Sequence, residues 1–357
     1  QVGILGDSTT GGAYEDALFE SIMPHLALGL TRLPIRRSLG LFDLTTALKT
    51  FSEVKNLQPD ILHGHGAKGG AFVRLIGSRL RVSRSRVARF YSPHGGSLHY
   101  DEKALRGRTY FAIERLLERW TDSLVFVSDY ERKAYEAKIG KPRTAWQLIH
   151  NGLRAEEFEP VVNRPDAVDF LYIGMMRDLK GPDVFIEALR RAEQLAGRPL
   201  RGVMVGDGDD KPRYQARLNV LGLGDRVKMH DAMPARDAFA LARTVVIPSR
   251  AESMPYIVLE AVAAGKPVIS TKVGGIPEIL GSDFAGFVPP GDTEALAKAM
   301  AHAIDDPEWL VGAMPAMEGF AAHFSARTMA ERMATLYHTT LDGRLRDTSD
   351  RAASSLS

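Results

Sequence analysis

Short apolar runs alternate with longer segments of helical periodicity along most of the chain. Each run has the length of a buried strand, and each longer segment repeats its apolar residues as an amphipathic helix does. The alternation predicts βαβ units that build mostly parallel, doubly wound sheets. In the first half, strands are predicted near residues 2–6, 28–34, 60–63, 87–91, 123–127 and 145–150. Helices are predicted there near residues 13–23, 43–56, 67–80, 101–120 and 129–138.

The same alternation continues in the second half, which begins near Asp169. Strands are predicted near residues 170–173, 201–205, 227–230, 245–248, 268–271 and 286–288. Helices are predicted near residues 182–196, 210–221, 235–243, 255–264 and 293–304. Ligands of such sheets bind beyond the carboxyl ends of the strands, so we expect the chemistry in the loops that follow strands.

The chain is long enough for two α/β domains, joined by an aperiodic linker within residues 151–165 that is rich in Pro, Asn and Glu. We expect an N-terminal domain over residues 1–155 and a C-terminal domain over residues 156–325. Residues 326–342 are predicted to form a terminal helix that crosses back to the N-terminal domain. Residues 343–357 are polar and Ser-rich, which predicts a flexible tail.

Composition narrows the classes of function. Of 357 residues, 45% are apolar and 25% are charged, which is typical of a globular protein. The net charge of +2 gives no reason to expect a nucleic-acid partner. The chain has no cysteine, which excludes thiolate metal sites and thiol catalysis and suits a reducing compartment, so we expect a cytoplasmic protein. No apolar run reaches the roughly 18 residues of a membrane span.

The segment from Pro248 to Pro267 carries two carboxylates at a predicted strand–loop–helix junction. Glu252 lies in the loop, and Glu260 lies inside a helix that begins near Pro255. A helix N-terminus offers unpaired N–H groups and a positive dipole end, which suit a diphosphate. Carboxylates beside it can accept hydrogen bonds from sugar or ribose hydroxyls. The spacing fits equally well a capping role for Glu252 and a solvated Glu260.

This segment resembles the E-x7-E motif of the family 4 retaining glycosyltransferases, which have the GT-B fold. That fold consists of two Rossmann-like, doubly wound domains that face each other across a cleft. The flanking residues resemble the family as well, at 248–249, 264–268 and 273–278. The resemblance implies that Glu260 binds the ribose of the donor nucleotide and that Glu252 lies near the donor sugar. The other donor-binding residues that it implies in this region are Ser253, Met254, Gly274 and Gly275.

A second resemblance covers residues 172–181, where a strand ends at Gly174 and a basic residue precedes the glycine that opens a helix. It implies that Lys180 neutralises the pyrophosphate of the leaving group. The family usually has an arginine directly after the first glycine, whereas this chain has Met175 there and an arginine at Arg177. Arg177 therefore matches less directly, and both bases could instead be solvated residues at a helix start.

A third resemblance lies in residues 205–210, where Gly206 and Gly208 would let the backbone approach the donor. Asp207 and Asp209 imitate a D-x-D metal motif. Because such triplets are common and the resemblance implies a metal-independent enzyme, we expect no metal and no other cofactor.

In the first half, residues 60–66 and 91–96 resemble loops of the acceptor domain. The resemblance implies that His94 hydrogen-bonds the transferred sugar or the donor phosphates. His63 and His65 alternate along a strand end, but two ligands are too few for a metal site, so we expect both side chains to pack at the end of the strand.

Before residue 60 the resemblance is loose. Residues 1–7 resemble the family's second strand, so we expect its first strand and helix to be absent, although Gly11-Gly12 could instead be its opening glycine loop.

Basic residues crowd residues 74–89, and basic and aromatic residues mix in residues 103–120. Such surfaces can hold an enzyme against anionic lipids, but a solvated basic face is an equal alternative. The family often modifies lipid-linked or polysaccharide acceptors at the bacterial inner membrane, which favours a peripheral contact there.

The resemblance therefore implies a retaining hexosyltransferase of polysaccharide or cell-envelope biosynthesis. It would move a hexose from a UDP- or GDP-sugar to a glycan or lipid-linked acceptor, with Glu252, Lys180 and His94 as the catalytic residues. Two alternatives remain open, namely a non-catalytic module that binds a nucleotide sugar and a GT-B epimerase that acts on a UDP-sugar.

Overall fold

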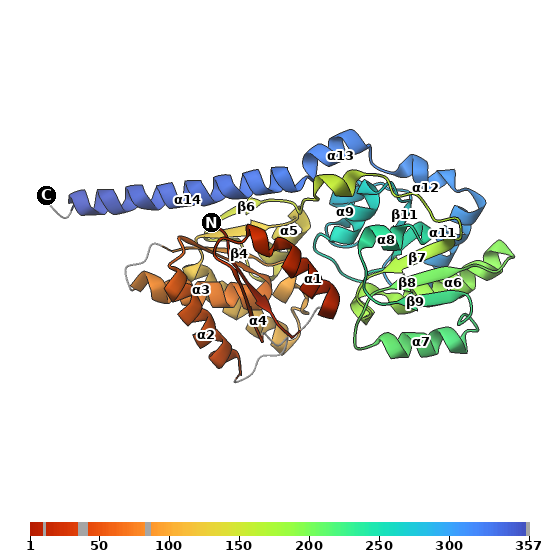
Figure 1. Cartoon of the computed structure of the whole chain (residues 1–357), viewed down its shortest axis with the longest axis horizontal. Helices are drawn as coiled ribbons and strands as arrows, with labels where there is room; N and C mark the ends of the chain where they lie inside the picture. The colour runs from red at the N-terminus through yellow and green to blue at the C-terminus, as the bar shows by residue number, and fades with distance from the viewer. Residues whose placement is uncertain (10–11, 35–41, 83–86, 355–357) are drawn as a thin grey trace. The chain divides into compact units, whose positions relative to one another are not determined.

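The computed structural model describes residues 1–9, 12–34, 42–82 and 87–354 (Figure 1). These residues form two compact units. Unit 1 contains residues 1–125 and 135–147 and the chain from residue 335 onward, whereas unit 2 contains residues 126–134 and 148–334. The predicted α/β fold with two parallel-sheet halves is confirmed.

Unit 1 contains a sheet with the strand order β3-β4-β5-β6 and a separate parallel pair, β1-β2. The strands are β1 (Ile4–Asp7), β2 (Leu30–Leu33), β3 (Ile61–His65), β4 (Ala88–Ser92), β5 (Ser123–Phe126) and β6 (Ala145–Leu148). The helices are α1 (Gly12–Ile22), α2 (Phe42–Leu57), α3 (Gly66–Val82) and α4 (Leu105–Leu117). Helix α5 (Asp129–Lys138) begins in unit 2 and ends in unit 1. Every residue of β4 and β5 is buried, as expected for central strands covered on both faces.

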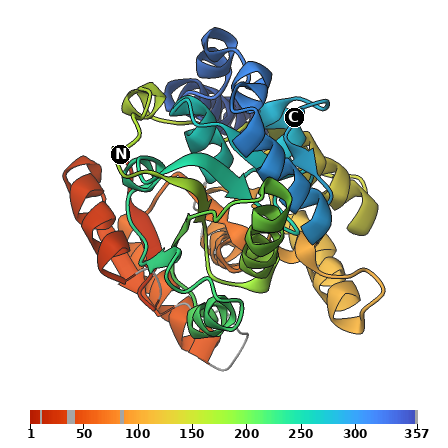
Figure 2. The same ribbon diagram turned by 90° about the vertical axis from the view of Figure 1, so that its right-hand side faces the viewer.

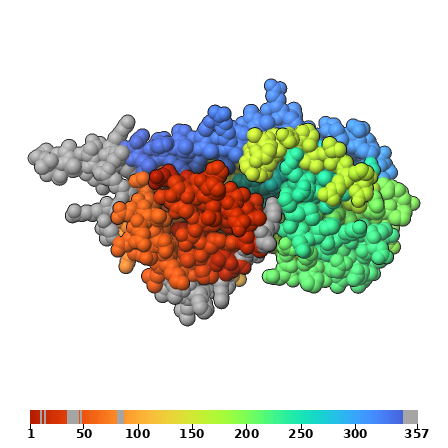
Figure 3. Space-filling model, viewed as in Figure 1, coloured from red at the N-terminus to blue at the C-terminus, as the bar shows by residue number. Residues whose placement is uncertain are grey.

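The N-terminal elements lie at the surface of unit 1, where the atoms of β1 and α1 are coloured red in Figure 3. Most described side chains of α1 are exposed. Of the two glycines that could form an opening glycine loop, Gly11 lies outside the described residues and Gly12 begins α1.

Unit 2 contains one parallel sheet with the strand order β12-β11-β10-β7-β8-β9. Its strands are β7 (Val168–Ile173), β8 (Gly202–Val205), β9 (Val227–His230), β10 (Ala242–Ile247), β11 (Val268–Thr271) and β12 (Phe287–Val288). The order reverses between β7 and β10, so helices lie on both faces of a doubly wound sheet (Figure 2). The carboxyl ends of β7 and β10 are therefore where a ligand is expected.

The helices of unit 2 begin and end where local chemistry allows it. They are α6 (Pro182–Ala196), α7 (Lys211–Val220), α8 (Ala235–Phe239), α9 (Tyr256–Ala263), α10 (Ile276–Leu280), α11 (Thr293–Asp305), α12 (Glu308–Ala313) and α13 (Met317–His323). Helix α6 starts at Pro182, whose missing N–H costs nothing there, and ends at Gly197, which has the left-handed φ of +64°. Its apolar face is buried against α11 and the sheet, where Phe185 and Leu189 are fully buried.

The last helix, α14, spans Ala326–Ser354, so it continues past residue 343, where the sequence predicted a flexible tail. The segment is polar, but it contains no proline, and its charged residues and alanines are compatible with a helix. The hydroxyl group of Tyr337 in this helix lies 2.6 Å from Nδ1 of His63 in unit 1.

Two arginines of the basic stretch 74–89 are buried rather than part of a basic surface, which corrects the sequence interpretation. Arg74 is fully buried and donates to Glu114 at 2.8 Å. Arg89 is 3% exposed and donates to Asp122 at 3.1 Å. Each guanidinium lies in the interior because a carboxylate from another part of unit 1 neutralises it. Positions 84 and 86 lie outside the described residues.

Candidate functional site

The carboxyl edge of the sheet in unit 2 brings together the loops that the sequence marked. The relevant loops follow β7, β8, β10 and β11, and they carry residues 174–181, 206–210, 248–255 and 272–275. Because all the strands of this sheet are parallel, the four loops meet at one edge.

The loops after β7 and β8 touch through their glycines. A Cβ atom at Gly206 would lie 2.0 Å from the carbonyl oxygen of Gly174, and one at Gly208 would lie 2.6 Å from that of Met176. Gly206 and Gly208 also have positive φ values of 144° and 157°. Only glycine allows this approach, so the two loops form a tight backbone wall at the edge of the sheet.

An ion pair joins the loop after β7 to the loop after β10. Lys180 ends a 3₁₀ turn at Asp178–Lys180, and its ammonium group donates to both carboxylate oxygens of Glu252, at 2.6 and 2.8 Å. Ser249 donates to the same carboxylate at 2.7 Å. The Glu252 residue is only 6% exposed, whereas the Lys180 side chain is 29% exposed. The lysine therefore neutralises a buried carboxylate and still presents positive charge to solvent.

The two glycines after β11 lie against the loop that carries Glu252. A Cβ atom at Gly274 would lie 2.2 Å from the carbonyl oxygen of Glu252, and Gly274 has a left-handed φ of 61°. Gly275 donates its N–H to the carbonyl oxygen of Ser253 at 2.7 Å, and a Cβ atom there would lie 2.4 Å from that oxygen. This glycine pair is required for the close approach of the two loops.

Side chains that the sequence analysis did not single out fix the loop from 249 to 255. The hydroxyl group of Ser253 donates to Glu131 at 2.9 Å, and the amide of Asn151 donates to the carbonyl oxygen of Met254 at 2.8 Å. Met254 is itself 4% exposed. These partners are more than 100 residues away along the chain, so no local sequence signal marks them.

Glu278 in α10 is a further residue that the sequence analysis left without a role. Its carboxylate accepts hydrogen bonds from the backbone N–H groups of Asp129 and Tyr130, each at 2.8 Å, and thereby caps the start of α5. His150 lies 3.4 Å from the same carboxylate. These hydrogen bonds lower the pKa of Glu278 even though burial opposes the shift. The only sequence signal was its place in the motif that follows Gly274-Gly275.

Helix α9 begins at Tyr256 directly after Pro255, and Glu260 lies inside it. Burial and the neighbouring charge of Glu157, against an opposing effect of Arg154, together raise the pKa of the Glu260 carboxyl group to about 7. In the described part of the chain, no side chain caps the N-terminus of α9, so Glu252 is not the capping residue that the spacing also allowed. The two carboxyl groups differ, because a lysine neutralises the charge of Glu252, whereas burial raises the pKa of Glu260 to about 7.

Arg177 does not join the ion pair. Its side chain is exposed, and its guanidinium lies 4.0 Å from the sulfur of Met175. The structure therefore brings together Lys180, Glu252 and the glycine loops, and it leaves Arg177 at the surface.

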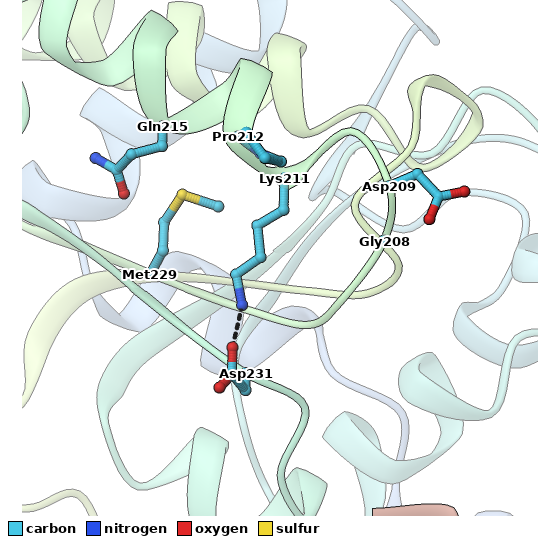
Figure 4. Close-up of a pocket in the computed structure, with 7 residues that line it drawn as sticks. All are labelled: Gly208, Asp209, Lys211, Pro212, Gln215, Met229 and Asp231. Carbon is cyan, nitrogen blue, oxygen red and sulfur yellow. Dashed lines mark hydrogen bonds and ion pairs between the residues drawn. The ribbon is translucent and has the colours of Figure 1, made fainter. Parts of the chain in front are cut away.

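A cavity of about 510 Å³ lies beside the loop after β8 (Figure 4). Lys211 lines it and donates to Asp231, to Asp207 at 3.2 Å and to the carbonyl oxygen of His230 at 3.1 Å. Asp207 also accepts the backbone N–H of Ala232 at 3.0 Å. The first carboxylate of the D-x-D triplet is thus engaged by a lysine and a backbone amide. Within the described ranges, no group of three or more His, Asp or Glu residues is arranged to hold a metal ion.

Unit 1 contains a separate cluster of histidines at the carboxyl edge of its sheet. Nδ1 of His65 lies 2.8 Å from Nε2 of His94, and the two rings stack. His63 lies between Tyr337 and the hydroxyl group of Ser92, at 2.6 and 2.8 Å. Burial lowers the pKa of His94 to about 4 and also lowers that of His65, so these imidazoles are neutral at pH 7. A neutral imidazole can donate or accept one hydrogen bond to a sugar or phosphate.

Comparison with known proteins supports the same interpretation in both halves of the chain. Residues 167–306 match the family described as glycosyl transferases group 1, and residues 2–152 match the glycosyl transferase 4-like domain. A D-inositol 3-phosphate glycosyltransferase of Streptomyces griseus is 33% identical over 188 residues, which is 49% of this chain and 40% of that protein. An alpha-D-kanosaminyltransferase of Streptomyces kanamyceticus is 31% identical over 144 residues, 39% of this chain and 36% of that protein. The chain thus spans about half or less of these curated relatives.

Solved structures share the fold at lower identity. Alr3699/HepE of Anabaena in complex with UDP-glucose has a TM-score of 0.74 and 18% identity, over 95% of this chain and 100% of that one. A sucrose-phosphate synthase of Thermosynechococcus elongatus has a TM-score of 0.74 and 21% identity, over 96% of this chain and 100% of that one. Two matched domains and a shared fold lead to one conclusion: this chain belongs to the group 1, family 4 glycosyltransferases, which have the GT-B fold.

Proposed function

We propose that this chain transfers a hexose from a nucleoside-diphosphate sugar, with UDP or GDP as the nucleotide, to a hydroxyl group of a glycan or lipid-linked acceptor. The observation that carries the proposal is the ion pair of Lys180 and Glu252 between glycine loops at the carboxyl edge of unit 2. The related Alr3699/HepE of Anabaena forms complexes with UDP and with UDP-glucose, which supports this class of donor.

In the proposed complex, the diphosphate lies beside Lys180. An ammonium group has three N–H donors, and Glu252 receives two of them, so one remains for a phosphate oxygen. The backbone of Gly174, Gly206 and Gly208 can approach the same diphosphate, because these residues carry no Cβ atom. Arg177 is exposed and has room to add charge when the donor binds.

The sugar and the ribose occupy opposite ends of the proposed site. Glu252 accepts hydrogen bonds from sugar hydroxyls, and the backbone of Ser253, Met254 and the Gly274-Gly275 loop lies against the sugar. Glu260 accepts the ribose hydroxyls, which requires its ionised form. A pKa of about 7 in the free protein means that donor binding should release a proton from a fraction of molecules near neutral pH.

The proposed chemistry retains the anomeric configuration. The bond from the anomeric carbon to the diphosphate breaks, the acceptor oxygen attacks from the same face, and the acceptor proton passes to the leaving diphosphate. Lys180 stabilises the charge that develops on the diphosphate, so the proposed reaction needs neither a metal nor another cofactor. Glu252 is engaged by Lys180 and Ser249, which favours a positioning role over attack as a nucleophile. We include His94 of unit 1 as a neutral hydrogen-bonding group for the sugar or phosphate.

Incubation with a panel of UDP- and GDP-hexoses, with and without an acceptor glycan, tests this function. The proposal predicts acceptor-dependent release of nucleoside diphosphate and, by NMR of the product, retention at the anomeric carbon. Glu252→Gln should lose turnover, whereas Glu156→Gln, a surface control, should not. Donor binding without turnover would instead indicate a non-catalytic module, and interconversion of donor epimers without an acceptor would indicate an epimerase. Either result would overturn the proposal.

We also propose that unit 1 touches the inner membrane from the cytoplasmic side, as a peripheral enzyme of cell-envelope polysaccharide synthesis would. Leu105, Ile113 and Leu116 of α4 are exposed at 80%, 41% and 47%, and their spacing places them on one face of the helix. Among the described residues, no helix is both long and apolar enough to span a bilayer. Sedimentation with anionic vesicles should pull down the wild type but less of Leu105→Asp, and equal sedimentation of the two would contradict the contact.

A further inference from the structure

Unit 2 has a second cavity, of about 830 Å³, at the amino edge of its sheet. Its walls include Asp169 at the start of β7 and Arg243 at the start of β10, together with Arg201, which precedes β8. The candidate donor loops lie at the carboxyl edge. A strand of six residues, such as β7, separates the two edges by roughly 20 Å. The cavity is therefore distinct from the site described above.

The walls of this cavity are strongly basic. Five cationic residues line it, against two acidic ones. The cations are Arg198, Arg201, Arg226, Arg243 and Lys266, and the acids are Asp169 and Glu308. One of the two acids is already engaged, because Arg198 donates to Asp169 at 3.1 Å and the backbone N–H of Arg201 donates to it at 2.8 Å. Arg226 in turn donates to Glu193 at 3.1 Å, behind the lining. Arg201, Arg243 and Lys266 then stand against Glu308 alone, so the walls keep an excess of positive charge.

Lys266 contributes a buried positive charge. The residue is 2% exposed, and its ammonium group donates to the carbonyl oxygen of Ala242 at 2.6 Å and to the side-chain oxygen of Asn163. Both acceptors are neutral. Burial lowers the pKa of Lys266 to about 8, so the group is still mostly charged at pH 7. A buried charge without an opposite charge is costly, and an anion in the cavity would offset that cost.

Several arginine donors remain available to a ligand. The side chains of Arg201 and Arg243 are exposed, and within the part of the chain that the structure describes neither guanidinium has a hydrogen-bond or ion-pair partner. Arg226 is less available, because its Nη2 donates to Glu193 at 3.1 Å and its Nε, which has no hydrogen-bond partner among the described residues, is buried. Planar guanidinium groups match phosphate oxygens in two-pronged geometry, which favours phosphate over a simple halide.

The lining of the cavity also includes apolar residues, among them Pro199, Ile304 and Val311. Its volume lies in the range of sites for small organic ligands and exceeds what an inorganic ion needs. Basic and apolar residues in one lining suit a molecule that carries a phosphate group on a small organic body.

We propose that the amino edge of unit 2 binds a small phosphorylated metabolite, such as a sugar phosphate, at a site separate from the donor loops. In this proposal Arg201 and Arg243 hold the phosphate, the buried Lys266 adds positive charge, and the apolar lining residues pack against the organic part.

Calorimetric titration with glucose 6-phosphate, inorganic phosphate and uncharged glucose at low ionic strength tests this site. Glucose 6-phosphate should bind the wild type more tightly than inorganic phosphate does, and glucose should not bind. The double variant R201A/R243A should bind at least about tenfold more weakly, because two charge-assisted contacts are lost. R201K/R243K, which keeps both charges, should recover part of the affinity. K228A/K298A, which removes two charges elsewhere on unit 2, should bind as the wild type does.

A donor-edge variant separates this site from the proposed function. Lys180→Ala should leave glucose 6-phosphate binding unchanged, whether or not the chain transfers sugar. Three results would overturn the proposal. They are no binding of glucose 6-phosphate, equal affinity of wild type and R201A/R243A, and loss of binding in the Lys180 variant.

Discussion

Glu260 offers a direct test of how the structure shapes the donor site, because its carboxyl group is desolvated and a like charge lies near it. Burial, together with Glu157, raises its pKa from 4.5 to about 7. An acid whose pKa is higher in the folded than in the unfolded state stabilises the fold only while protonated. Its contribution is therefore lost as the pH rises from about 4.5 through 7. At pH 8 the full shift corresponds to about 3 kcal/mol, and partial exposure of the side chain reduces this to about 2 kcal/mol.

Glu260→Gln removes the ionisation while keeping the size of the side chain. We expect this variant to be more stable than the wild type by about 2 kcal/mol at pH 8 and by less than about 1 kcal/mol at pH 5. Urea unfolding of unit 2 at both pH values would measure the difference. Glu156→Gln, an exposed neighbour, should match the wild type at both. A Glu260→Gln protein that is no more stable than the wild type at pH 8, or whose advantage is independent of pH, would refute the reasoning.

The result bears on function because Glu260 costs stability while no ligand is present. Residues that oppose folding and lie at a binding edge are typical of functional sites. If Glu260 accepts ribose hydroxyls as a carboxylate, the donor supplies hydrogen bonds that no described residue gives this side chain.

Three further predictions concern single residues. Gly206→Ala should destabilise unit 2 by at least about 2 kcal/mol, since the new Cβ would lie 2.0 Å from the Gly174 carbonyl oxygen, and an unchanged Tm would contradict this. Glu114→Gln should cost about 3–5 kcal/mol in urea unfolding, because the buried guanidinium of Arg74 loses its carboxylate, and a wild-type midpoint would argue against it. Lys180→Ala should weaken UDP binding by at least about tenfold in calorimetry, and an equal Kd would show that this lysine does not meet the diphosphate.

The strands and the longer helices could be predicted from the sequence because their signal is local. All six strands of unit 2 lie where apolar runs placed them, and α6 and α11 have clear helical periodicity. The sequence did not predict α10, α12 or α13, which have five, six and seven residues. Two turns or fewer are too short for periodicity to show.

The contacts of the candidate site could be predicted only in part. The motifs marked Lys180 and Glu252, but the salt bridge between them joins residues 72 positions apart, and no spacing rule reveals it. The hydrogen bond between His63 and Tyr337 spans 274 positions. Arg74 is buried because Glu114 from another helix neutralises it. That partner is also distant along the chain, so the sequence alone suggested that the basic stretch 74–89 forms a surface.

We propose that the carboxyl edge of unit 2 binds a nucleoside diphosphate and that Glu260 holds its ribose. Thermal unfolding of the wild type, Glu260→Ala and Glu156→Ala with and without UDP or GDP tests it most directly. At about 100 times the Kd, one nucleotide should stabilise the wild type and the Glu156 variant by about 2.7 kcal/mol, which is several degrees in Tm. Glu260→Ala should lose most of that shift. A wild type whose Tm neither nucleotide changes, or a Glu260→Ala protein that responds as the wild type does, would contradict the account.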